Sequence, residues 1–175
     1  ELSKVEAENV FTSALRPREQ QFFTDLGFTL HEELFLLAQN FETPIDFPTR
    51  PSRKFRHSDW GELLKIDNAA FPQFWQFDGP ALAEAISATR RTRIRIDAQD
   101  GPAGFAITGR SGRVGFLQRV AVHPHHQRIG LGHSLVADAL PWSNRRFVRE
   151  LLVNTQTTNS RALSLYESMG VNKEH

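Results

Sequence analysis

Hydrophobic and polar positions follow strand and helix periods in turn along most of the chain. A capping residue at Ser58 or Asp59 precedes an apolar stripe at helical spacing, and strict alternation predicts a strand over Arg91–Asp97. A strand–helix–strand succession near the end implies parallel pairing, so we expect an α/β fold. The other elements predicted from residue 54 onward are strands over 54–56, 104–108, 115–122 and 148–154, a hairpin turn at Asp100-Gly101, and helices over 81–87, 126–140 and 159–169.

The first part of the chain has its own pattern. Residues 10–15 have strand-like content, Pro17 suits the first turn of a helix that ends near Asp25, and residues 29–38 predict a second strand. Prolines at positions 44, 48 and 51 cannot support a regular element and predict a linker. We therefore expect a partial βαβ unit over residues 1–41, a linker over 42–53 and the main domain over 54–175.

A weak internal echo relates the two ends of the chain. The helix that precedes Gly27 aligns with the helix that precedes Gly170, and Phe23 then falls on Tyr166. The first unit would be a copy of the last βα unit in which polar groups have been replaced. Chance similarity between two βα units explains the echo equally well.

Composition excludes several classes of protein. Lys and Arg total 21 against 20 Asp and Glu, so no global field draws the chain to nucleic acid or to acidic lipid, and neither partner is expected. The absence of cysteine excludes disulfides, zinc–thiolate sites and cysteine nucleophiles. No apolar stretch approaches the ~20 residues of a membrane span, and no charged-then-apolar leader opens the sequence, so we expect a cytoplasmic protein.

The most informative stretch is residues 117–135. A buried strand, Val120-Ala121-Val122, leads into a helix whose first turn contains Gly130 and Gly132. Free N–H groups and the helix dipole at such a turn attract an anion, and glycines allow close approach to the backbone. This predicts a phosphate-binding turn, with tight packing on the sheet as the alternative. The polar residues that flank the turn are Gln127, Arg128 and His133.

Gln127–Gly132 resembles the Q/R-x-x-G-x-G/A motif of the GNAT acetyltransferase superfamily. Asn159–Gly170 is similar to the N-x-x-A-x-x-L-Y-x-x-x-G helix of its ribosomal-protein and peptide-amine acetyltransferases. The FPQFWQFD and LVNTQ stretches look like actinobacterial members whose N-terminal part is a decayed second copy. The resemblance covers about residues 54–170. It implies a three-layer fold around a central mixed, strongly twisted sheet.

The resemblance also implies acetyl-CoA as co-substrate. In relatives the pyrophosphate lies on the glycine turn, the pantetheine arm follows the central strand, and the Asn that caps the last helix touches that arm. The matching residues of this chain are Val120, Ala121, Val122, Gln127, Arg128, Ile129, Gly130, Leu131, Gly132, His133, Asn159 and Tyr166.

Tyr166 is the only tyrosine of the chain and lies two helical turns after Asn159, so both face the same side. A phenol with a pKa near 10 can pass a proton to a departing thiolate, and the resemblance gives Tyr166 the family's general-acid position. The alternative is a packing aromatic.

The family pattern breaks at the general base. Where peptide-acetylating relatives have Glu, this chain has Asn154, which accepts no proton at neutral pH, and Gln118 on the central strand is equally inert. The amine must be deprotonated through water, by a carboxylate such as Asp67 or Asp78, or before it binds.

Substrate contacts are expected from Gln118, Asn154 and the aromatic segment 71–77. Within this segment Phe71, Trp75 and Phe77 either wall an acceptor pocket or bury the N-terminal unit. The histidines between residues 123 and 126 lack acidic or cysteine partners, so no metal site is expected.

We therefore expect an N-acyltransferase in which an amine, from a small molecule or from a peptide or protein, attacks acetyl-CoA directly in a ternary complex. A catalytically inactive module that binds CoA or another protein is the alternative. Formation of a homodimer is one of the alternatives, because family members need a strand or two after the last helix and only residues 171–175 follow it here. The missing strand lies outside this sequence, or residues 28–38 supply it from the N-terminal unit or a partner chain.

Overall fold

The computed structural model describes residues 10–41, 47–97, 99, 101–145 and 147–173. Two compact units divide the chain between Leu34 and Phe35. Asp100 of the expected hairpin turn lies outside the described residues. None of the described helices is both long enough and apolar enough to cross a membrane.

The first unit contains the helix α1 (Pro17–Asp25), which begins at the predicted proline and is followed by Gly27 at φ +90°. The strand expected over residues 10–15 is wrong, because this segment is irregular. Strand-like composition does not suffice there, since a strand is stable only when a neighbour satisfies its backbone groups.

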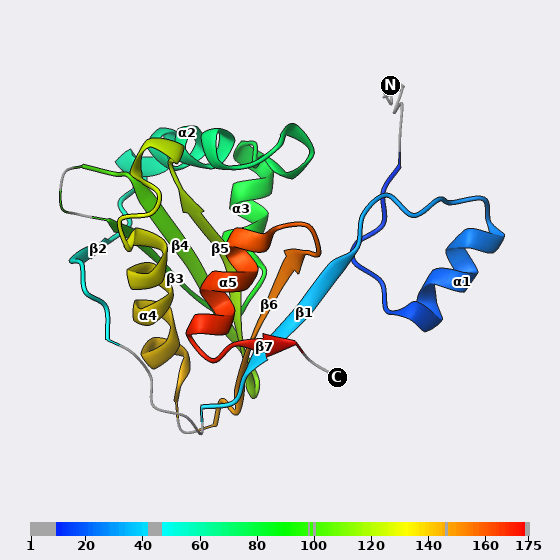
Figure 1. Cartoon of the computed structure of the whole chain (residues 1–175). Coiled ribbons are helices and arrows are strands. Elements are labelled where there is room, and N and C mark those ends of the chain that lie inside the picture. Colours follow the sequence, from blue (N-terminus) through cyan, green and yellow to red (C-terminus); the bar gives the residue numbers. More distant parts are fainter. Residues whose placement is uncertain (1–9, 42–46, 98, 100, 146, 174–175) are drawn as a thin grey trace. The chain divides into compact units, whose positions relative to one another are not determined.

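The second unit is built on a seven-stranded mixed sheet in the order β2-β3-β4-β5-β6-β1-β7 (Figure 1). The order of elements predicted from residue 54 onward is confirmed, with boundaries that shift by a few residues. The strands are β1 (Leu34–Gln39), β2 (Ser52–Lys54), β3 (Arg91–Asp97), β4 (Gly104–Ser111), β5 (Val114–Val122), β6 (Glu150–Gln156) and β7 (Asn172–Lys173). The helices are α2 (Trp60–Ala70), α3 (Gly79–Ser87), α4 (Leu131–Ser143) and α5 (Ser160–Ser168), with short 3-10 turns η1 (His57–Asp59), η2 (Gln73–Trp75) and η3 (Pro124–His126).

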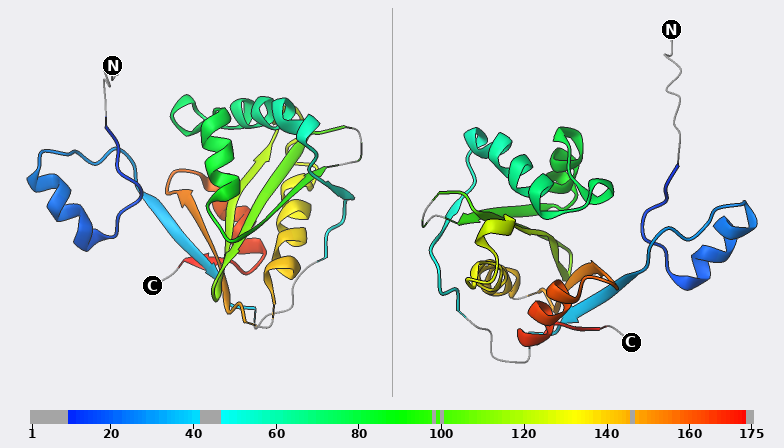
Figure 2. Two further views of the ribbon diagram at one scale, coloured as in Figure 1. Left: turned by 180° about the vertical axis from the view of Figure 1, so that it is seen from behind. Right: turned by 45° about the horizontal axis from the view of Figure 1, so that its top comes forward.

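Helices cover both faces of the sheet, which gives three layers (Figure 2). Under α2 and α3, Leu63, Ile66 and Leu82 pack against β3–β5 side chains that include Phe105 and Ile107. A second cluster joins α4 and α5 to β1, β5 and β6 on the opposite face. Each fully buried side chain of this kind contributes about 1.5–3 kcal/mol. The three-layer α/β fold with a mixed, twisted sheet is thus confirmed.

The strand β1 lies between β6 and β7, although it precedes every other strand in the chain. Leu37 and Ala38 pair antiparallel with Lys173 and Asn172, and Leu37 is fully buried in the cluster under α4 and α5. A segment from the first forty residues therefore supplies an inner strand of the sheet beside β6. This strand starts later than predicted, at Leu34.

Candidate functional site

The central strand β5 diverges from its parallel neighbour β6 partway along its length. Their pairing covers only Val114–Phe116 of β5, whereas β4 stays paired with β5 as far as Val122. The register with β4 shifts between Ile107 and Thr108, so Gln118 is the extra residue of a β-bulge. Because a bulge bends the strand and increases its twist, β5 turns away from β6 here.

The open edge of β5 presents the backbone groups of Val120 and Val122. His123 donates its N–H at 2.9 Å to the carbonyl that precedes β4, and backbone groups alternate along a strand, so Val120 and Val122 direct theirs away from β4. The Val122 carbonyl accepts a hydrogen bond of 3.1 Å from Gln127 Nε2. Ala121 differs from both, because its groups face β4 and its side chain is buried in the core.

The turn after β5 exposes the start of a helix. α4 begins at Leu131 instead of near His126 as predicted, because Gly130 takes a left-handed φ of +81° as the N-cap. Arg128, at φ +64°, is also left-handed. The first N–H groups of α4, at Leu131 and Gly132, have no acceptor within the helix, and together with the helix dipole they favour an anion.

Packing on the sheet does not explain the two glycines. A Cβ on Gly130 would meet nothing within 4 Å, and its positive φ accounts for the glycine. A Cβ on Gly132 would lie 3.4 Å from Leu165 Cδ2, an ordinary contact. A helical glycine costs about 1 kcal/mol relative to alanine. Neither φ nor contact requires Gly132, which favours close approach of a ligand over tight packing.

A second cation lies beside this turn. Arg161, on α5, donates from Nη1 to Gln127 Oε1 at 3.0 Å. It supplements Arg128 of the predicted phosphate turn, and both side chains are exposed. Sequence reasoning missed Arg161, because only the packing of α5 on the sheet brings it near Gln127.

Asn159 caps the last helix, as the sequence predicts. Asn159 is the N-cap, and its Oδ1 accepts the Ala162 N–H at 3.1 Å. Tyr166 faces the core and is 6% exposed. Burial raises the pKa of its phenol to about 12, and the positive charge of Arg119 opposes this rise. The phenol is therefore protonated throughout the neutral range.

The ion pair of Arg119 with Asp67 was not anticipated from the sequence. Arg119 Nε and Nη2 donate to the two Asp67 carboxylate oxygens at 2.7 and 2.8 Å, and the Phe77 N–H donates to the same carboxylate at 2.8 Å. The side chains are 9% and 1% exposed. Asp67 is thus occupied by structural partners, which argues against a role as general base.

The same arginine holds the aromatic segment 71–77 over β5. Its guanidinium carbon lies 3.5 Å from the Phe71 ring centroid and 4.1 Å from that of Phe77, and it donates to the Trp75 carbonyl. Phe71 and Phe77 also pack against the core cluster under α2 and α3. The segment is therefore anchored to the strand that carries the open edge.

Three further predicted residues have defined surroundings. Gln118 donates from Nε2 to the Ala85 carbonyl at 2.8 Å, and its buried Oε1 has no hydrogen-bond partner among the described residues. Asn154 is exposed on β6. Asp78 caps α3 by accepting the Ala81 N–H at 2.8 Å. No group of His, Asp or Glu in the described part of the chain could hold a metal ion.

Comparison with known proteins agrees with this geometry. Residues 60–171 match the acetyltransferase (GNAT) family. The [ribosomal protein bS18]-alanine N-acetyltransferase of Salmonella typhimurium is 34% identical over 116 residues, which cover 62% of this chain and 78% of that protein. The Escherichia coli K12 enzyme of the same name is 37% identical over 71 residues, 41% of this chain and 48% of its own length.

Solved structures have the same fold. The crystal structure of the ribosomal-protein-S18-alanine N-acetyltransferase from Escherichia coli superposes with a TM-score of 0.63 at 26% identity, over 71% of this chain and 79% of that one. A GCN5-related N-acetyltransferase from Sphaerobacter thermophilus gives 0.68 at 17% identity, over 90% of this chain and 53% of that one. The chain belongs to the acetyltransferase (GNAT) family and is an N-acetyltransferase, which transfers an acyl group to an amine.

Proposed function

We propose that the chain binds acetyl-CoA with its arm along the open edge of β5 and its pyrophosphate on the turn Gln127–His133. The family uses acetyl-CoA as acyl donor. The observation that carries the assignment is Gly132, a helical glycine that neither backbone conformation nor packing requires. It follows a strand edge that pairs with no strand among the described residues. Arg128 and Arg161 supply positive charge beside the turn.

Acetyl transfer then proceeds by direct attack. The amine nitrogen attacks the thioester carbonyl, the carbon–sulfur bond breaks, and the thiolate takes a proton. N–H groups at the open edge of β5 are placed to polarise the carbonyl, since preorganised donors stabilise the developing oxyanion. No residue is needed as a covalent carrier.

Tyr166 is the proposed proton donor. Its raised pKa keeps the phenol protonated. This pKa lies about 3.5 units above that of an ordinary thiol, so proton transfer from the phenol to a solvated thiolate is uphill by about 5 kcal/mol. The same burial raises the pKa of a thiolate bound beside it, because desolvation disfavours both anions. The two pKa values are therefore matched only where the thiolate is desolvated as well.

Deprotonation of the amine uses water in this proposal. Asp67 and Asp78 have structural partners, and Asn154 and Gln118 carry no basic group. The amine enters neutral, or loses its proton to solvent near Asn154, which is exposed on β6. The relatives named above act on an alanine of a ribosomal protein, so a peptide amine is the first acceptor to screen.

The test is Tyr166→Phe against Ser168→Ala, which removes an exposed hydroxyl from the same helix. Loss of a general acid lowers kcat by about 10²–10⁴-fold and leaves the acetyl-CoA dissociation constant within twofold. Ser168→Ala keeps wild-type turnover. Unchanged turnover in Tyr166→Phe removes Tyr166 as the acid.

Binding is tested separately by thermal unfolding. Acetyl-CoA at a hundredfold excess over its dissociation constant adds about 2.7 kcal/mol, a midpoint rise of roughly 5–10 °C at this chain length. No rise with acetyl-CoA or CoA overturns the cofactor assignment and favours a module that acts through protein contacts.

A further inference from the structure

A cluster of arginines lies far from the proposed acetyl-CoA turn. A cavity of about 500 Å³ opens where β3 begins and β4 ends, and its lining includes Arg90, Arg91, Arg110 and Arg145. It lies beside the start of β5, whereas the acetyl-CoA turn follows the end of that strand. Nine strand residues separate the two places by about 25–30 Å. We call this cavity the arginine pocket.

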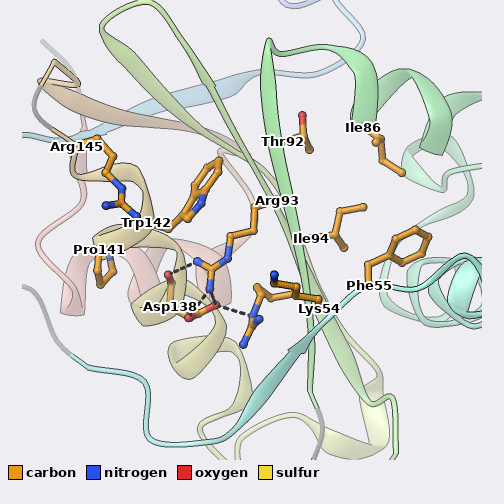
Figure 3. A pocket seen from close by; sticks show the side chains of 11 residues that line it. Lys54, Phe55, Ile86, Thr92, Arg93, Ile94, Asp138, Pro141, Trp142 and Arg145 are labelled. Carbon is orange, nitrogen blue, oxygen red and sulfur yellow. Dashed lines mark hydrogen bonds and ion pairs between the residues drawn. The ribbon is translucent and has the colours of Figure 1, made fainter.

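The arginine pocket has no countercharge of its own. None of its described lining residues is acidic, and no ion pair of the described residues includes one of its four arginines. The neighbouring cavity differs: there Arg93 and Arg95 approach the Asp138 carboxylate at 2.9 and 3.2 Å (Figure 3). Among the described residues, Arg93 and Arg95 are thus neutralised by Asp138, whereas Arg90, Arg91, Arg110 and Arg145, the last of which lines both cavities, have no ion pair.

Two of the arginines oppose each other across the sheet. Arg91 and Arg110 are register partners of β3 and β4, so their side chains share a face, and like charges placed directly opposite destabilise a sheet. Burial, together with the positive charges of Arg145, Arg91 and Arg93, lowers the pKa of Arg110. A bound anion would remove this repulsion.

Stacking restricts the Arg110 side chain. Its guanidinium carbon lies 4.0 Å from the Trp142 ring centroid, and its buried Nε has no hydrogen-bond partner among the described residues. A guanidinium already held in place loses less conformational freedom when it binds an oxyanion. Trp142 and Arg145 lie on the same side of β3 as Arg93 (Figure 3).

The helix dipole explains only part of the cluster. Arg145 follows the end of α4 at Ser143, where a cation is favourable. Arg91 and Arg110 belong to strands, so the dipole gives no reason for that pair.

We propose that the arginine pocket binds a small phosphorylated anion, a diphosphate or a phosphate ester. A guanidinium group can donate two parallel hydrogen bonds to the oxygens of one phosphate. The cavity volume also falls within the range of small-molecule sites. Its positive lining repels a protonated amine, which argues that this site is separate from that of the acetyl acceptor.

The test is calorimetric titration of the full chain with pyrophosphate. We expect Arg91→Gln and Arg110→Gln each to raise the dissociation constant for pyrophosphate at least tenfold. Arg91→Gln unfolds at the wild-type temperature or above, because it relieves repulsion, whereas Arg110→Gln also loses the stacking on Trp142. The matched control is Arg18→Gln, an exposed position of α1, which removes the same charge elsewhere and keeps the affinity within twofold.

Four results overturn the proposal. The first is the absence of any heat of binding. The second is an affinity that is lowered by Arg128→Gln but not by the variants of the arginine pocket, which places pyrophosphate on the acetyl-CoA turn. The third is binding of single-stranded RNA without binding of pyrophosphate, which makes this face a nucleic-acid surface. The fourth is full affinity in Arg145→Gln, a variant outside the strands that keeps the test decisive should the strand variants fold poorly.

Discussion

Replacing Asp67 by Asn tests whether the Arg119–Asp67 pair is a desolvated charge pair. The asparagine keeps the size of the side chain, but it removes the negative charge and presents an amide N–H₂ to a guanidinium that only donates. The side chains are 9% and 1% exposed, so the charge of Arg119 is left buried and uncompensated. Breaking a buried pair in this way costs about 3–5 kcal/mol.

Thermal unfolding measures this loss. At this chain length 3–5 kcal/mol corresponds to a fall of about 6–20 °C in the midpoint. The matched control is Glu62→Gln on the same helix α2, which breaks the exposed ion pair to Lys65. Surface pairs contribute about 0–1 kcal/mol, so the control moves the midpoint by at most a few degrees.

A double variant separates charge from volume. Asp67→Leu with Arg119→Met replaces both partners by apolar side chains and recovers most of the lost stability, because no buried charge is left unpaired. An Asp67→Asn midpoint within about 2 °C of the wild type would refute the reasoning, since Arg119 would then be solvated.

Three further predictions follow from single positions. Gly132→Ala raises the KM for acetyl-CoA at least tenfold, while the free protein unfolds at the same or a higher temperature because alanine is favoured by about 1 kcal/mol; an unchanged KM contradicts close backbone approach. Tyr166, the only tyrosine, ionises near pH 12 in the folded chain and near 10 in denaturant, as followed by near-ultraviolet absorbance; a native transition near 10 contradicts its burial. The side-chain hydrogen bond from Arg53 lowers the pKa of Asp59 from 3.8 to about 2, so the pair stabilises the fold above pH 4 and this contribution is lost as the pH falls toward 2. Urea unfolding at pH 6 and pH 3 therefore shows a smaller acid loss for Asp59→Asn than for the wild type, and equal losses contradict the pair.

The sequence by itself determined most of the helices and strands and the glycine turn before α4. Periodicity, a proline at the start of α1 and an Asn at the cap of α5 predict helices that the structure contains. The glycine turn is predicted as well, because φ and the helix dipole depend on residues adjacent in the chain. The same local information misplaced the start of α4, since it did not show that Gly130 ends one turn and caps the next helix.

The tertiary structure alone decided which residues meet. Arg119 and Asp67 are 52 positions apart, and Arg161 and Gln127 are 34 apart, so no spacing rule relates them. The bulge at Gln118, which opens the edge of β5, depends on register with β4 and not on composition. The order of strands depends on which arrangement buries the most apolar surface while pairing most of the backbone groups, and residues distant in sequence contribute to both. For this reason β1 lies between β6 and β7, a place that no pattern within residues 34–39 encodes.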